Sequence, residues 1–310
     1  MVSMYHASRT DRAYHAFRSQ VIDQVRDYFK SQGVLEVFTP LLRAHTVTDP
    51  YIDSIKTPDG YLQTSPEMAM KILLGHGSRD IFQLLPVFRD EPILGAYHQR
   101  EFLLLEWYRV DMHYKQLMQE VTHLIQLLCG NISVTCQSLQ EALKAFYQCD
   151  LWQLSDNEIE KLTREHIDVS GDLQLNDCYD FLIEKLVKNT TTDLVVFHGF
   201  PKSMQLMSRF DNNTNSALRF ECYLWGHEIA NGFSELNDPI EQRQRFDNDN
   251  HIRQMINKPN IALDNEFLES LRCMPDCSGV ALGIDRLIWI FIAISGEVCK
   301  YPSGVFMLSI

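Results

Sequence analysis

The chain has 310 residues, of which 45% are hydrophobic and 22% charged, a balance typical of a globular protein with a substantial core. Its formal net charge of −13 disfavours extended contact with a phosphate backbone, so no stable nucleic-acid binding is expected. The longest strongly apolar run, residues 287–294, is far shorter than the roughly 20 residues of a membrane helix. Because residues 1–14 also lack the apolar stretch of a secretory signal, we expect a cytoplasmic protein whose eight cysteines are reduced.

The first third of the chain contains clear helix and strand patterns. Residues 14–33 carry apolar side chains at three- and four-residue spacing, which predicts an amphipathic helix that stops at Gly33. A second helix is predicted to begin at Ser65-Pro66-Glu67, because Ser can cap, Pro suits the first turn and Glu favours the positive end. Strands are predicted over residues 34–38, 51–55, 60–63, 81–89 and 101–108. The last two form an antiparallel hairpin with a long loop, residues 90–100.

The rest of the chain is less regular until its final third. Residues 112–200 are predicted to be mostly helical and hold little recognisable chemistry. Further elements are predicted as strand-like segments at residues 219–224 and 228–236, a charged helix over 241–256, and an apolar strand from 279 that leads into a closing helix. Because no repeat, low-complexity tract or linker is visible, we predict a single domain over residues 1–310.

Two arginines lie at positions suited to binding anions. Arg89-Asp90-Glu91 comes where a predicted strand gives way to a loop, and the planar Arg fork can bind a carboxylate or a phosphate. In Gly283-Ile284-Asp285-Arg286, Arg286 would add its charge to a helix N-terminus that attracts phosphate. Taken alone, each motif is weak, since an Arg-x-Glu at a turn is more often an exposed ion pair.

Glu221, Glu228 and Glu235 follow one another at seven-residue spacing. On a helix this spacing would line a solvated face. The surrounding strand-like pattern, with Gly226 and Gly232, instead places the three acids on adjacent strands. Converging carboxylates there would hold Mg²⁺ against ATP or bind a cationic substrate. The residues alone leave both the solvated helix face and the converging carboxylates open.

The order of these motifs resembles a known family. A helix, a strand and Pro40, then Phe88-Arg89-Asp90-Glu91 with His98, Glu101 and Phe102, then Gly283-x-Asp285-Arg286, resemble motifs 1, 2 and 3 of class II aminoacyl-tRNA synthetases. Ser65-Pro66-Glu67, Glu106-Trp107-Tyr108 and residues 228–236 resemble the substrate-pocket segments of lysyl-tRNA synthetase. Glu106-Trp107-Tyr108-Arg109, Ala230-Asn231-Gly232-Phe233 and residues 274–283 are closer still to the elongation factor P (R)-β-lysine ligases, short paralogues of lysyl-tRNA synthetase. The resemblance spans about residues 10–294 and is weakest between about 112 and 200.

The resemblance implies a role for each matched residue. Arg89 and Glu91 would hold ATP and the activated carboxylate, and Arg286 would bind the γ-phosphate. Further ATP contacts are implied at Asp90, His98, Gln99, Phe102, Glu228, Ile229 and Gly283, and Mg²⁺ ligands at Glu221 and Glu228. Glu67, with Ser65 and Pro66, would meet the amine near the carboxylate. The group around the side-chain ammonium would comprise Glu106, Tyr108 and Glu235, with Asn231, Phe233 and Ala281 as further substrate contacts.

Some positions depart from the family pattern. Asp90 stands where Asn is usual, and Gln99-Arg100 replaces Asn-Pro after His98. The loop between Glu91 and His98 is one residue longer and has Ala96 where a basic residue is common. These differences concern the ATP contacts of the loop, and Arg100 is a candidate to supply the missing charge.

The implied fold is α+β, an antiparallel six-stranded sheet flanked by helices, without an anticodon-binding domain and with the first helix and strand forming a homodimer interface. The implied activity is ATP- and Mg²⁺-dependent activation of (R)-β-lysine or lysine as its adenylate, followed by transfer to a lysine side chain of elongation factor P. The alternatives are a truncated enzyme that acylates tRNA and a non-catalytic regulatory paralogue. Amidation of a free amino acid is a more distant one.

Overall fold

The computed structural model describes residues 12–90 and 99–295. Its elements divide into two compact units, one formed by the described residues up to 131 and from 235 onward and the other by residues 132–234. The prediction of a single domain stays a prediction.

The first unit is built around the strands of the predicted hairpin. Its elements are α2 (Arg12–Ser31), β1 (Leu35–Glu36), β2 (Leu42–Arg43), β3 (Lys56–Thr57), β4 (Gly60–Leu62), α3 (Glu67–Gly75), β5 (Ile81–Phe88), β6 (Glu101–Val110), α4 (Tyr114–Cys129), α8 (Pro239–Met255), α9 (Asn265–Ser270), β12 (Cys277–Gly283) and α10 (Ile284–Ser295). Strands β1, β5, β6 and β12 are neighbours in that order, and β2, β4 and β3 form a small separate sheet. Strands β5, β6 and β12 run antiparallel, whereas β1 is parallel to β5.

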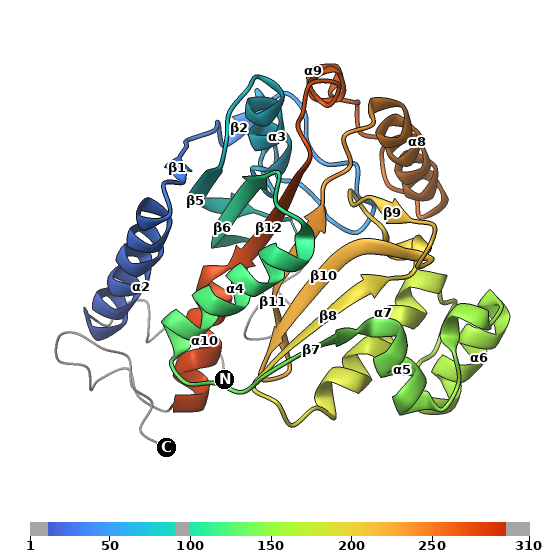
Figure 1. The fold of residues 1–310 in the computed structure, drawn as a ribbon. Helices are drawn as coiled ribbons and strands as arrows, with labels where there is room; N and C mark the ends of the chain where they lie inside the picture. The colour runs from blue at the N-terminus through green and yellow to red at the C-terminus, as the bar shows by residue number, and fades with distance from the viewer. Residues whose placement is uncertain (1–11, 91–98, 296–310) are drawn as a thin grey trace. The chain divides into compact units, whose positions relative to one another are not determined.

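Helix α2 forms because its apolar side chains recur on one face, and it ends before Gly33, whose φ of +70° favours glycine. The ring of Phe29 stacks on Phe82 of β5 at 4.6 Å and meets Trp107 of β6 edge-on at 5.2 Å. Helix α4 packs against β12, and α10 packs against β6 (Figure 1). Strand β6 is therefore a central strand, buried from Leu103 to Val110. Any charged side chain on this stretch must lie in the interior.

The second unit combines strands with a helical layer. It contains β7 (Val134–Ser138), α5 (Leu139–Tyr147), a 3₁₀ turn (Leu151–Gln153), α6 (Asp156–His166), α7 (Leu175–Lys188), β8 (Leu194–Phe200), a second 3₁₀ turn (Lys202–Met204), β9 (Phe210–Asp211), β10 (Ser216–Leu224) and β11 (His227–Ser234). The strand order is β11, β10, β8, β7, with β9 paired to β10. An apolar core between the helices and the strands includes Leu143, Leu182 and Phe197.

The α+β class is confirmed, but the sheet differs from the expected six antiparallel strands. The two units together hold more strands than six, and the pairs β1–β5 and β7–β8 are parallel. Strands β7 and β8 lie in the region predicted to be mostly helical, where the alternation of the two short segments is hidden between long amphipathic helices. The predicted strand at residues 51–55 is also wrong, because no strand is formed there.

Candidate active site

One face of the first unit's sheet carries three of the predicted substrate residues, Glu106, Tyr108 and Ala281. Glu106 and Tyr108 are two residues apart on β6, so their side chains share a face. On β12, Ala281 lies directly opposite Glu106, and Gly279 lies opposite Tyr108. The register therefore brings the predicted residues of two distant segments to one patch.

Glu106 is a carboxylic acid in the interior, only 2% exposed. Ser65 Oγ donates a hydrogen bond to Glu106 Oε2 at 2.8 Å, and the Tyr108 hydroxyl donates to Oε1 at 2.7 Å. Burial, reinforced by the charge of Glu67, raises the pKa of Glu106 to about 8 despite these hydrogen bonds. Glu106 is therefore largely protonated at neutral pH until a cation arrives to favour its charged form.

Ser65, Pro66 and Glu67 begin helix α3 as predicted. Pro66 is the buried N-cap residue, and Ser65 Oγ accepts a hydrogen bond from the backbone N–H of Glu67 at 3.0 Å. Ser65 thus joins the start of α3 to Glu106. The same geometry holds Glu67 next to Glu106. Glu67 is the acid that the resemblance assigns to the substrate amine near the substrate carboxylate.

The structure adds a residue that the sequence did not indicate. Lys71, one turn beyond Glu67 on α3, is completely buried. Its Nζ lies 2.7 Å from Glu67 Oε1 and 2.6 Å from Glu235 Oε2. Burial alone would lower the pKa of Lys71, but Glu235 and Glu67 outweigh burial and raise it, so the side chain stays charged. The only hint of this role in the sequence was a single basic residue within the otherwise apolar run from Met68 to Leu74.

Glu235 is 1% exposed and lies beyond the end of β11, where its backbone N–H donates to the carbonyl of Cys277 at 3.0 Å. Only glycine fits at position 279, next to Glu235 and Tyr108. A Cβ on Gly279 would lie 2.4 Å from Glu235 Oε1 and 2.4 Å from Cε1 of Tyr108. The missing side chain at position 279 therefore gives Glu235 and Tyr108 the room to approach one another. We call Glu67, Glu106 and Glu235 the acidic cluster.

The predicted ATP residues of motif 2 lie at the other end of the β5–β6 hairpin. The Arg89 guanidinium lies 5.2 Å from the centre of the Phe102 ring, which orients its planar fork. Phe102 and Glu106 are four residues apart on β6, about 13 Å along an extended strand. Arg100 forms an exposed ion pair with Asp90 at 3.3 Å, and Gln99 is half-buried. Glu91 and His98 lie outside the described residues.

Motif 3 is organised by Asp285, which the sequence reasoning did not assign. Its Oδ1 accepts from Arg18 of α2 at 2.8 Å, and its Oδ2 accepts from the backbone N–H of Leu103 at 2.8 Å. Asp285 thereby ties the first turn of α10 to both the motif 1 helix and the motif 2 strand. Gly283 ends β12, and Arg286 follows Asp285 in the first turn of α10. The carboxylate in the Gly-x-Asp-Arg pattern was the signal that could have found this role.

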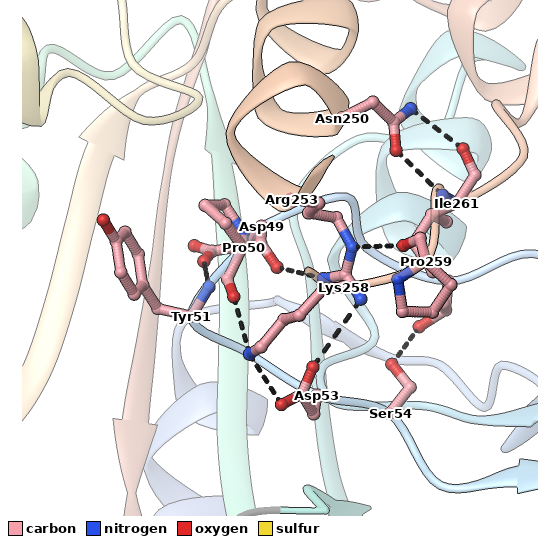
Figure 2. A network of polar contacts seen from close by, with 11 residues as sticks. Asp49, Pro50, Tyr51, Asp53, Ser54, Asn250, Arg253, Lys258, Pro259 and Ile261 are labelled. Atoms are coloured by element: carbon pink, nitrogen blue, oxygen red, sulfur yellow. Dashed lines mark hydrogen bonds and ion pairs between the residues drawn. The ribbon is translucent and has the colours of Figure 1, made fainter. Parts of the chain in front are cut away.

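A loop over residues 46–54, which we call the strap, is bound to the end of α8 (Figure 2). Arg253 donates to the carbonyl of Asp49 at 2.9 Å. Lys258 Nζ donates to the carbonyl of Pro50 at 2.8 Å and to the Asp53 carboxylate at 2.7 Å (Figure 2). The carbonyl of Asp53 accepts from the backbone N–H of Asp90 at 2.7 Å. The strap therefore supports the residue next to Arg89.

The predicted metal ligands belong to the second unit, on β10 and β11. Arg219 and the Tyr223 hydroxyl each hold one oxygen of Glu221. Burial raises the pKa of Glu221 to about 7, with Arg219 opposing and Glu228 adding to the shift. Asp180, which sequence reasoning missed, has its pKa raised to about 6, first by burial and then by Glu228.

A divalent cation would relieve this accumulation of acids, but the protein does not provide a complete shell for it. Within residues 12–90 and 99–295, no group of three or more His, Cys, Asp or Glu is arranged to hold a metal ion. Mg²⁺ commonly takes one or two carboxylates and completes its octahedron with phosphate oxygens and water. Glu221 and Glu228 fit that kind of shared site, not a site built by protein alone.

The remaining predicted residues of the second unit follow the strand alternation of β11. Asn231 accepts from Arg219 at 3.1 Å and lies opposite Glu221. Ile229 is buried, whereas Phe233 is half-buried. Arg219 therefore links Asn231 to Glu221, and this network is part of the reason why Glu221 stays in place.

The fold, the three motifs and the polar sheet face are those of the class II aminoacyl-tRNA synthetase catalytic domain, and comparison with known proteins agrees. Residues 4–302 match the family described as tRNA synthetases class II (D, K and N), and the chain belongs to this family. It is 37% identical to the elongation factor P–(R)-beta-lysine ligase of Haemophilus ducreyi, over 87% of both chains. It is 37% identical to the same-named protein of Haemophilus influenzae, over 89% of this chain and 90% of the relative, and 36% identical to that of Salmonella arizonae, over 87% and 88%. The predicted resemblance is thus confirmed.

In the described ranges, every helix is too short or too polar to traverse a lipid bilayer.

Proposed function

We propose that the chain is an ATP-dependent ligase that activates (R)-β-lysine or lysine as its adenylate and transfers it to a lysine side chain of elongation factor P. The observation that carries the proposal is the acidic cluster, in which Glu106 and Glu235 are buried and Glu67 is half-buried, together with Arg89 at the loop end of the β5–β6 hairpin. A diamino acid needs several carboxylates, because an unpaired ammonium in the interior is costly. The names of the relatives support the acceptor.

In the proposed reaction the amino-acid carboxylate attacks the α-phosphorus of ATP, and the bond to pyrophosphate breaks. Arg89 and Arg286 stabilise the charge that develops on the phosphates, and Glu221 with Glu228 would hold the Mg²⁺ that neutralises it. The acidic cluster and Tyr108 hold the ammonium groups and orient the carboxylate. In the second step an amine nitrogen of the acceptor attacks the acyl carbon, AMP leaves, and the nitrogen loses a proton.

The proposal is tested by incubating purified protein with ATP, each lysine isomer, elongation factor P and total tRNA, and reading the products by mass spectrometry. We expect a mass increase on elongation factor P that depends on ATP and a lysine isomer. Arg286→Ala should lose about a hundredfold in amino-acid-dependent pyrophosphate exchange, because one charged contact to a transition-state phosphate contributes on the order of 3 kcal/mol. Acylated tRNA with unmodified elongation factor P would favour the tRNA-charging alternative, and absence of exchange would favour the non-catalytic one.

We also propose that the first helix and strand form a homodimer interface. Leu35, Phe38 and Leu42 follow α2 and are 63%, 77% and 43% exposed. A second copy packed on this segment would cover the three apolar side chains. We call these three residues the apolar edge.

A further inference from the structure

Lys71 is a buried charge that the proposed reaction does not use. An ammonium with no exposed surface is retained only where its partners repay the loss of hydration. Lys71 has two such partners, Glu67 of its own helix and Glu235 from the segment after β11. One carboxylate would suffice for a structural ion pair. The second pairing joins two acids that are 168 residues apart in the chain, and both are assigned to substrate ammonium groups.

The charges of this region can be counted. When all are ionised, the three carboxylates of the acidic cluster and the one ammonium of Lys71 leave a net charge of −2. Two ammonium groups neutralise the fully ionised cluster, whereas with a single ammonium Glu106 keeps its proton and no ion pair forms at that carboxyl group. The Tyr108 hydroxyl donates to Glu106 and keeps its proton, because burial and the acids around it raise its pKa.

We propose that Lys71 is a positioning residue and the internal counter-ion of the acidic cluster. It holds the carboxylates of Glu67 and Glu235 in place, and it sets a charge that selects diamino acids over monoamino acids. The selectivity part rests on the proposed function, whereas the counter-ion part does not. The groups that face Lys71 and its partners are Glu67, Glu235, Glu106 and Tyr108, from α3, the segment after β11, and β6.

The first test needs no substrate. In Lys71→Met, Glu67 and Glu235 lose their counter-ion, so their pKa values rise and the native state retains a proton that the unfolded chain releases. Denaturant unfolding should show Lys71→Met losing stability, relative to Lys161→Met, as the pH rises from 5 to 9. Lys161 is the matched control, since its side chain is 79% exposed. Lys71→Arg keeps the charge and should follow the control. Parallel curves for Lys71→Met and Lys161→Met would overturn the counter-ion role.

The second test measures selectivity by calorimetric titration with (R)-β-lysine, L-lysine and norleucine, which lacks the second amine. Glu235→Gln leaves the cluster with a charge of −1 and should bind the lysines at least tenfold more weakly. Adding Lys71→Met to Glu235→Gln restores −2 and should recover several-fold in affinity. A merely structural Lys71 predicts the opposite order, with the double variant weaker, and that order would overturn the selectivity part.

These two arms separate the possible failures. If the unmodified protein binds neither lysine isomer, the proposed function fails, and the pH series still decides the counter-ion role. If Lys71→Met does not fold, the double variant leaves one carboxylate fewer without its counter-ion, because Glu235, the more deeply buried partner of Lys71, is removed with it. The comparison of the double variant with Glu235→Gln then carries the decision.

Discussion

At the scale of single residues, the site depends on ionisable groups that the interior forces to share charge. Glu106 is held by Ser65 and Tyr108 on a central strand, and burial decides its protonation more than either hydrogen bond does. Such an acid is poised to give up its proton when a cation binds. Binding of a diamino acid at neutral pH is therefore expected to release a proton.

The raised pKa of Glu106 has a consequence for stability. Between its ordinary pKa of 4.5 and about 8, the native state keeps a proton that the unfolded chain has lost, so stability falls as the pH rises through this window. Glu106→Gln removes the titration, and its stability relative to the unmodified protein should increase by up to about 1.4 kcal/mol per pH unit there. Urea unfolding at pH 5, 7 and 9 measures the difference, and a constant difference would contradict the assignment.

Ala281 lies opposite Glu106 in the β6–β12 register, so its methyl group is on the same face as the acid. One methyl group next to a substrate can shift a preference by about 1 to 3 kcal/mol. We expect the unmodified protein to prefer (R)-β-lysine over α-lysine, and Ala281→Gly to move the preference toward α-lysine. The ratio of kcat/KM values in pyrophosphate exchange measures it. Equal use of both isomers by the unmodified protein would refute this prediction.

At the scale of elements, the strap shows how a loop without strand pairing can still be held in place. Arg253 near the end of α8 and Lys258 just after it bind the strap through backbone carbonyls and the Asp53 carboxylate (Figure 2). The carbonyl of Asp53 in turn accepts a hydrogen bond from the backbone N–H of Asp90. The chain of contacts runs from a helix end to the residue beside Arg89. Sequence periodicity cannot detect it, because strap and helix end are some 200 residues apart.

Removing one of these cations should loosen the strap. Lys258→Met deletes two hydrogen bonds, one to a carboxylate, and we expect a several-fold rise in KM for ATP with a smaller change in KM for the amino acid. Hydrogen exchange over residues 46–54 and at Asp90 should become faster. Lys161→Met serves as the matched control. Unchanged exchange at Asp90 would show that the strap does not support that end of β5.

At the scale of the whole molecule, the proposed homodimer interface can be tested at the apolar edge. Phe38 is the most exposed member of the apolar edge, so Phe38→Asp places a charge where a second copy would pack. We expect this variant to shift the species seen by light scattering from dimer toward monomer. Ile240→Asp, at an exposed apolar position on α8 outside the apolar edge, should leave the mass unchanged. A monomeric unmodified protein would contradict the interface.

The amino-acid sequence by itself determined the long elements and the identity of the motif residues. Helix α2, the β5–β6 hairpin, the start of α3 and the strand before α10 appeared close to their predicted places, because each has a strong local pattern. The motif order was sufficient to predict the family. The acids of the cluster were named through the resemblance of their segments to the substrate-pocket segments of lysyl-tRNA synthetase.

Tertiary structure decided how those residues are used. Strands β1 and β7 are short and gain their hydrogen bonds from partners elsewhere in the chain, so local patterns do not define them. Lys71 and Asp285 show no role until distant segments bring Glu235, Arg18 and Leu103 beside them. The protonation of Glu106 depends on burial, which is a property of the packed interior and not of the neighbouring residues in the chain.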